Sequence, residues 1–220
     1  MGIAAAFVLM IALALTGCGG EPKPVDGADQ RGRAETDATD GKPPKADAVL
    51  PPGGEAPRLA GEGLEGAARA AGCKLESFKS TSRGHVSDPD QEIDYSSAPP
   101  TSGKHFATAA EDAAYLTAPD EKALVHSLEH GRAVIRFKAD LPRGARASLR
   151  AFFEEDSFQT LLTPDETGSD YEVAATAWNR DPSPNGTGRP LGCDAFTPKV
   201  FEALQAFKKR HRSKGPEAIP

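Results

Sequence analysis

The chain has 220 residues, with 26 Lys and Arg against 32 Asp and Glu, which gives a formal net charge of −6. A net acidic chain lacks the broad basic surface that nucleic-acid-binding proteins use to neutralise phosphates. We therefore exclude nucleic acid as a partner. The length leaves room for one ordinary domain of about 150 residues and additional segments.

An uninterrupted apolar run occupies residues 3–16 and is followed by Gly17 and Cys18. The run is shorter than the ~20 residues of a membrane-spanning helix, but it has the length of the apolar region of a secretory signal. The tetrapeptide LTGC, which ends at Cys18, reads as a lipobox, whose cysteine is lipidated and becomes the mature N-terminus. We predict a lipoprotein signal over residues 1–18, with Cys18 as the lipidation site. A plain signal peptide with an incidental cysteine is the alternative.

Residues 19–63 are rich in Gly, Pro, Asp, Ala and Lys and contain few large apolar side chains. Such a segment buries too little surface to offset the entropy lost on ordering. We predict a disordered tether over 19–63 that holds a folded domain, residues 64–217, on the extracytoplasmic face of a membrane. The membrane, reached through the lipid anchor, is then the one partner that the sequence indicates.

The first part of the domain has short and weak patterns. Its clearest signals are Gly72, which is placed to stop a helix, and Asp120, which is placed to cap one. The predicted elements are a helix over 64–71, strands over 75–78 and 92–95, a helix over 111–116 and a helix over 121–130.

The second part has stronger periodicity. We predict that the strands over 158–162 and 171–178 pair as a hairpin, because turn-forming residues separate them. The other predicted elements are a strand over 133–137, a helix over 143–155, a loop over 181–192 and a last helix over 198–212 with Thr197 as its N-cap. This order indicates a single α+β domain with a small mixed sheet and flanking helices.

Lipidation of Cys18 would leave Cys73 and Cys193 as the remaining thiols. In an exported protein, two thiols favour a disulfide. The alternative is that one of them is a metal ligand.

Three of the five histidines, His105, His126 and His130, lie between residues 95 and 137. Residues four apart in a helix leave the same face, so His126 and His130 are spaced to reach one metal ion, zinc or copper. His105 follows a Pro-rich turn and is the third candidate ligand, and His85 is an additional one. Glu129 is placed to orient an imidazole from outside the ligand set. The alternative is that the histidines bond to backbone groups without a metal.

The segment from His126 to His130 also spells H-x-x-E-H, the inverted motif of some zinc peptidases. In that interpretation Glu129 is the general base. Gly131 cuts the helix directly after the second histidine, and Glu202 is the best downstream candidate for a third ligand. We therefore regard a hydrolase as the weaker hypothesis.

Several motifs together resemble a bacterial family known as domain of unknown function 3105. They are Gly72-Cys73, GHV at 84–86, Tyr95 with PPTSGKH at 99–105, LVHSLEHGRAVIRF at 124–137, ATAW at 175–178, Gly192-Cys193 and GPE at 215–217. The resemblance implies an exported or membrane-anchored protein without an established activity. It also implies that His105, His126 and His130 belong together as motif residues.

The sequence thus predicts an envelope lipoprotein whose domain binds zinc or copper and acts in binding or delivery. A metal-free interaction module is the principal alternative.

Overall fold

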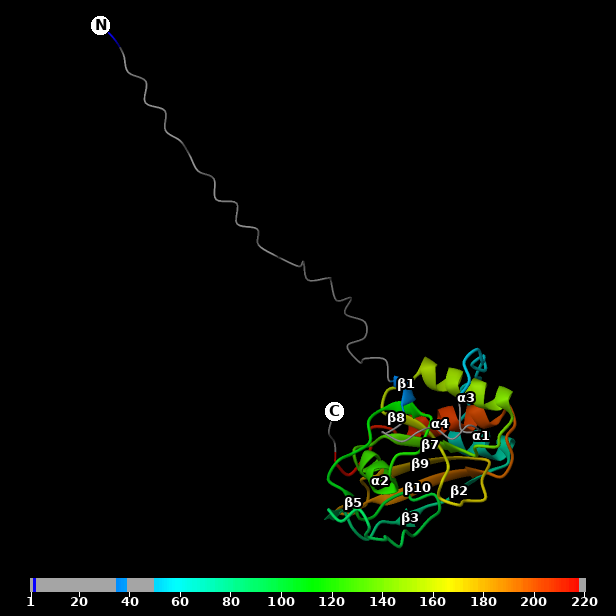
Figure 1. Cartoon of the computed structure of the whole chain (residues 1–220). Helices are drawn as coiled ribbons and strands as arrows, with labels where there is room; N and C mark the ends of the chain where they lie inside the picture. The colour runs from blue at the N-terminus through cyan, green and yellow to red at the C-terminus, as the bar shows by residue number, and fades with distance from the viewer. Residues whose placement is uncertain (1, 3–34, 39–49, 218–220) are drawn as a thin grey trace. The chain divides into compact units, whose positions relative to one another are not determined.

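The computed structural model describes residue 2, residues 35–38 and residues 50–217 (Figure 1). The predicted signal with Cys18, and most of the predicted tether, lie outside the described residues. From residue 35 onward the described chain belongs to one compact unit. Within the described ranges, no helix has both the length and the apolar character that crossing a membrane requires.

An eight-stranded mixed sheet forms the centre of this unit, in the order β1-β6-β8-β7-β9-β10-β2, with β3 also paired to β10. The neighbouring strands β1, β6, β8 and β7 run parallel to one another. The remaining strands, β9, β10, β2 and β3, pair antiparallel to their neighbours. The strands are β1 (Glu35–Ala38), β2 (Cys73–Leu75), β3 (Phe78–Lys79), β6 (Ala113–Tyr115), β7 (Ala133–Phe137), β8 (Thr160–Pro164), β9 (Val173–Asn179) and β10 (Thr187–Cys193).

Helices cover both faces of the sheet (Figure 1). On β7, Ile135 and Phe137 belong to the core shared with three helices, while Val134 points to the opposite face and packs with the fourth. The three helices are α1 (Leu64–Ala71), α3 (Arg143–Glu155) and α4 (Val200–His211), and the fourth is α2 (Glu121–Glu129). The predicted α+β fold is confirmed.

A separate two-stranded sheet lies on the α2 side and consists of β4 (His85–Val86) and β5 (His105–Phe106). The two strands are parallel, and their register places His85 directly beside His105. Residues 20 apart in sequence are thereby brought together, which the chain pattern did not predict.

The local signals were read correctly where they are strong. α1 has its predicted bounds and ends at Gly72, whose φ of 72° is left-handed. The Asp120 side chain accepts a hydrogen bond from the Lys122 N–H and caps α2 as predicted. β7 and α3 also have their predicted bounds.

The predicted helix over 111–116 is wrong, because Ala113–Tyr115 form strand β6. The backbone of this short segment pairs between β1 and β8, so tertiary pairing overrides the helical preference of alanine. The predicted strand over 92–95 is wrong as well, since these residues have no regular structure.

The predicted hairpin is also wrong. β8 pairs with β6 and β7, whereas β9 pairs with β7 and β10, so β7 lies between the two strands that the sequence joined. The reason is α3, which connects β7 to β8 as a crossover and makes them parallel neighbours.

Part of the predicted loop over 181–192 is strand β10, the partner of β9 over seven residues. Glycine is unfavourable in strands, so the glycines of this segment led to the prediction of a loop. Each of them permits a close approach: a Cβ on Gly188 would collide with Thr101, and one on Gly192 with the Tyr171 ring. Thr197 makes no side-chain cap, because α4 begins at Val200 and its cap is Lys199.

The described residues include some on the N-terminal side of the predicted boundary at residue 64. β1 pairs with β6, and Leu50, which is 1% exposed, packs in the core together with the partly buried Leu59. These leucines are the few large apolar side chains of the segment, and their burial explains why residues 50–63 lie on the domain.

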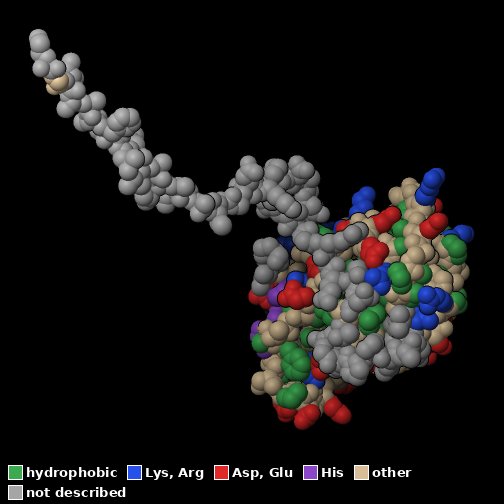
Figure 2. All heavy atoms as spheres, turned by 45° about the horizontal axis from the view of Figure 1, so that its top comes forward, with side chains coloured by type: hydrophobic (Ala, Val, Ile, Leu, Met, Phe, Trp, Pro, Cys, Tyr) green, Lys and Arg blue, Asp and Glu red, His purple; other side chains and the backbone are tan. Residues whose placement is uncertain are grey.

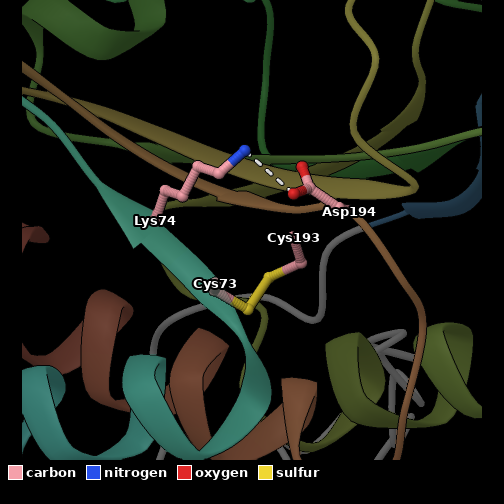
Figure 3. Close-up of a disulfide and its surroundings, with 4 residues drawn as sticks. All are labelled: Cys73, Lys74, Cys193 and Asp194. Atoms are coloured by element: carbon pink, nitrogen blue, oxygen red, sulfur yellow. Dashed lines mark ion pairs between the residues drawn. A yellow bond between two sulfur atoms is a disulfide. The ribbon is translucent and has the colours of Figure 1, made fainter.

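The predicted disulfide is confirmed: Cys73 and Cys193 are bonded across β2 and β10 (Figure 3). Beside it, the Lys74 Nζ lies 2.9 Å from an Asp194 carboxylate oxygen. Neither cysteine is therefore available as a metal ligand.

Candidate metal centre

Four of the five histidines gather in one cluster on the α2 side of the sheet. The ring centroids of His105 and His126 lie 4.8 Å apart, those of His126 and His130 lie 4.4 Å apart, and those of His85 and His105 lie 4.9 Å apart. Figure 2 shows that histidine side chains reach the surface at one edge of the molecule. His85, which is exposed, and the buried His105 and His126 thus span the distance from solvent to interior.

The Pro-rich loop before His105 is fixed against the sheet. Thr101 occupies the space that a side chain at position 188 would fill, and the Tyr95 hydroxyl donates to the Lys104 carbonyl at 2.9 Å. The buried Trp178 of β9 meets the His105 ring edge-on, with centroids 5.9 Å apart. The His105 ring is therefore held from the loop and from the sheet.

Helix α2 supplies His126 and Glu129, which are three residues apart and so share one face. The helix is anchored on its buried side, where the Ser127 hydroxyl donates to the Ala110 carbonyl at 2.7 Å. His126 is 5% exposed and Glu129 is 1% exposed. Both polar side chains therefore point into the domain.

One group of donors brings these elements together. A nitrogen of each of three histidines and one carboxylate oxygen all lie within 4.8 Å of one another. The residues are His85, His105, His126 and Glu129. Atoms at this separation can surround a single ion after small movements, because metal–ligand bonds of about 2 Å place neighbouring donors about 3–3.5 Å apart.

The hydrogen bonding of the His105 ring suits a metal ligand. Its Nδ1 lies 2.8 Å from the Gly103 carbonyl oxygen and must donate, since a carbonyl can only accept. The neutral ring then has its lone pair on Nε2, which lies 3.0 Å from a Glu129 oxygen but makes no aligned hydrogen bond. Two acceptors that face each other in this way are complementary to a cation.

Glu129 is an ionised carboxylate in this setting. Burial alone would raise its pKa, but the close contacts with His105 and Arg83 outweigh burial and lower the pKa to about 2. The Arg83 Nε donates to one carboxylate oxygen, so the other is left toward His105. A carboxylate with so low a pKa is a ready ligand and a weak general base.

His126 is neutral at pH 7. Burial, followed by the neighbouring His130 and His105, lowers its pKa to about 4. Its Nδ1 is buried and has no hydrogen-bond partner. A buried nitrogen without a partner costs free energy, which a bound ion would recover.

His130 belongs to a second group, with His126 and Glu217, whose donors also lie within 4.8 Å of one another. The C-terminal segment brings Glu217 there, because the Glu217 N–H donates to the Glu129 carbonyl at 3.0 Å and the Ser213 N–H to the Gly131 carbonyl at 2.8 Å. The Nε2 of His130 lies 3.7 Å from a Glu217 oxygen. His130 thus faces the chain end and is absent from the first group.

Gly131 makes this docking of the C-terminal segment feasible. It has a φ of +86°, and a Cβ there would lie 2.9 Å from the Gly215 nitrogen. We expect Gly131→Ala to lower the free energy of unfolding by about 2 kcal/mol, through left-handed strain and the contact with Gly215. Urea unfolding measures this loss.

Gly66→Ala is the matched control for Gly131→Ala, because Gly66 lies inside α1, where a Cβ meets no atom closer than 3.7 Å. It should leave stability equal or raised by up to about 1 kcal/mol. Equal losses in the two variants would contradict the role given to Gly131.

The structure therefore groups the predicted residues differently from the prediction. His105 and His126 lie together, the additional candidate His85 joins them, and Glu129 offers an oxygen directly in place of its predicted orienting role. Glu217 was missed, and its position in the GPE motif was the signal for it. Glu202, the candidate third ligand of the peptidase hypothesis, instead accepts hydrogen bonds from the backbone N–H groups of residues 60 and 62.

The fifth histidine, His211, lies elsewhere at the end of α4 and donates from Nδ1 to the Asn179 side-chain oxygen at 3.1 Å. Burial, and then Arg189 and Arg210, lower its pKa to about 4. Between this value and the unfolded pKa of about 6.5, the unfolded chain binds a proton that the folded chain does not. The free energy of unfolding should therefore fall as the pH falls from about 6.5 to about 4.

Replacing His211 by glutamine should make that pH dependence shallower by up to about 1.4 kcal/mol per pH unit. Urea unfolding in the presence of chelator, at several pH values between 4 and 7, measures the slope. Burial also lowers the pKa of His126 and of His130, so some slope should remain. An unchanged slope in the variant would contradict the prediction.

Comparison with known families gives a match over residues 85–218 to the family described as "Protein of unknown function (DUF3105)". The matched range contains both donor groups. Curated proteins and solved structures gave no match to the chain.

Proposed function

Since the chain belongs to the DUF3105 family, whose function is unknown, we propose its role from the site alone: the domain binds a divalent transition metal ion, zinc or copper. The proposed ligands are His85, His105, His126 and Glu129. The observation that carries the proposal is the Nε2 of His105, which faces a carboxylate oxygen at 3.0 Å while its Nδ1 donates to a carbonyl.

The donor set determines which class of ion fits. Three imidazoles and one carboxylate suit zinc and cupric copper, whereas cuprous copper prefers sulfur ligands. Both methionines of the chain, Met1 and Met10, lie in the predicted signal, and the cysteines Cys73 and Cys193 are joined. Sulfur is thus absent from the cluster of described residues.

The same donor set favours binding over hydrolysis. Four protein ligands fill a tetrahedral zinc site, whereas catalytic zinc keeps one position for water. The H-x-x-E-H hypothesis also needs Glu129 as a base near neutral pH, and His105 and Arg83 lower the pKa of Glu129 to about 2. The proposed role is therefore binding or delivery of an ion.

A metal-free structural cluster is the second candidate, and the same 3.0 Å contact supports it. If His105 is doubly protonated, it forms a buried ion pair with Glu129, which Arg83 also contacts. In that case the cluster would fasten the β4–β5 sheet to α2 and need no ion.

Glu129→Gln distinguishes the two candidates, because it keeps the shape and removes the charge. For a metal site, the variant should bind zinc at least about tenfold more weakly, and chelator should lower the melting temperature of the wild type more than that of the variant. For an ion pair, the variant should lose stability equally with and without chelator. The chain from residue 19 onward is the protein to use.

We also propose that the protein is anchored through Cys18 to the extracytoplasmic face of a membrane. The lipobox pattern supports this, and the Cys73–Cys193 disulfide is typical of oxidising compartments. We expect Cys18→Ser to move the protein from the membrane fraction to the soluble fraction, as followed by immunoblotting. Retention of the variant in the membrane fraction would contradict lipid anchoring at Cys18.

A further inference from the structure

Two residues beside the proposed site, one of them a glutamate, are not among its ligands. His130 and Glu217 form a second donor group with His126, and the His126 and His130 rings lie 4.4 Å apart. His126 is common to both groups. The two groups are therefore adjacent, and an ion held by the first group is already bound to one ligand of the second.

The surroundings of the second group favour a cation. His130 is the C-cap of α2, where the helix carries a partial negative charge. Glu217 is held there by its N–H bond to the Glu129 carbonyl. This group is also more open, since the side chain of Glu217 is 40% exposed, against 2% for that of Glu129.

A competing contact makes the second group the weaker one. Arg132 donates to the Nδ1 of His130 at 3.2 Å, so the neutral ring carries its proton on Nε2, the nitrogen that faces Glu217. Binding through Nε2 requires the proton to move to Nδ1 and the Arg132 amino group to turn away. The Nε of the same rigid guanidinium donates to Asp112 at 2.7 Å, which opposes this movement and weakens binding at the second group.

A neutral imidazole has one lone pair, so His126 can serve one ion at a time. We propose that His126, His130 and Glu217 form a second, weaker position for the same divalent transition metal ion, in exchange with the buried position. This inference rests on the proposed function. It gives the ion a more exposed position from which a solvent ligand or a chelating partner can take it.

The test is a double-mutant cycle on zinc affinity, measured by competition with a chromogenic chelator. The four proteins are wild type, His85→Ala, His130→Ala and the double variant. His85 is exposed and belongs only to the buried position, so removing it spares the fold and weakens that position alone. His211→Ala is the matched control, since His211 lies outside both groups.

With His85 present, the weaker position holds a minor share of the ion, so His130→Ala should raise the Kd less than about threefold. With His85 replaced, the second position holds most of the ion, and His130→Ala should raise the Kd at least about tenfold. Glu217→Gln should repeat this pattern, which guards against a folding defect specific to His130→Ala.

Equal fold-changes in the two backgrounds would overturn the second position and leave the buried site intact. Two ions per wild-type chain would overturn the exchange of a single ion. If wild type binds no zinc and no copper, the proposed function itself fails. These results are distinguishable within one set of titrations.

Discussion

The His126→Ala variant should lose nearly all specific metal affinity. A structural zinc site contributes about 10–16 kcal/mol in total, so each of four ligands contributes about 2.5–4 kcal/mol, or roughly 100- to 1000-fold in Kd. His126 belongs to both donor groups, so its loss cannot be compensated by His130 or Glu217. The expected result is at most a trace of zinc or copper after dialysis, where wild type retains about one ion per chain.

The control must separate loss of a ligand from loss of the fold. His126 is 5% exposed, so replacing it by alanine also leaves a cavity and lowers stability. We therefore expect the melting temperature of wild type to fall on chelation, whereas that of His126→Ala is low from the start and does not change with chelator. His211 is also a buried histidine, with 9% of its surface exposed, and the His211→Ala variant should retain the ion.

Either of two results would contradict metal binding at this cluster. If His126→Ala has the same metal content as wild type, the ion is not bound at this cluster. If chelator leaves the melting temperature of wild type unchanged, the histidines are structural. In either case the buried ion pair of His105 and Glu129 becomes the better explanation of the cluster.

The sequence predicted the elements whose signals are local. Gly72 in the left-handed region and the side chain of Asp120 each set a helix boundary within a few residues, so α1 and the start of α2 were predicted correctly. Strand β10 was missed because its glycines admit Thr101 and Tyr171, and those neighbours are distant in sequence. A strand defined by what packs on it has no local signature.

The same distinction applies to the candidate site. The i, i+4 spacing of His126 and His130 was visible, but that spacing cannot tell which partner each ring faces. His105 reaches His126 because the loop before it docks on β10, and His85 reaches His105 through the β4–β5 pairing. Both contacts are long-range. A third long-range contact, between the C-terminal segment and α2, places Glu217 near His130.

The second large effect concerns the disulfide. Cys73 and Cys193 are 120 residues apart, and cross-linking a loop of this length stabilises the native state by about 5 kcal/mol in the chain-entropy model. A domain of this size has a total stability of about 5–15 kcal/mol. Loss of the bond should therefore remove about a third or more of the free energy of unfolding.

The position of the bond adds to its effect, because β2 is a three-residue strand at the end of the sheet and follows α1 directly. Without the cross-link, a short pairing with β10 must hold this end of the chain against the core. We expect the Cys73→Ala/Cys193→Ala variant to unfold at a much lower urea concentration, as followed by far-ultraviolet circular dichroism. Alanine is the right replacement because Cys193 is fully buried.

Reductant is the internal control for this prediction. It should shift the urea midpoint of wild type to that of the double variant and leave the variant unchanged. Zinc should then restore part of the lost stability, by RT ln(1 + [L]/Kd), because each group combines donors that are distant in sequence and that come together only in the folded chain. A wild-type midpoint that reductant does not move would show that the short β2 pairing and the α1 contacts suffice without the cross-link.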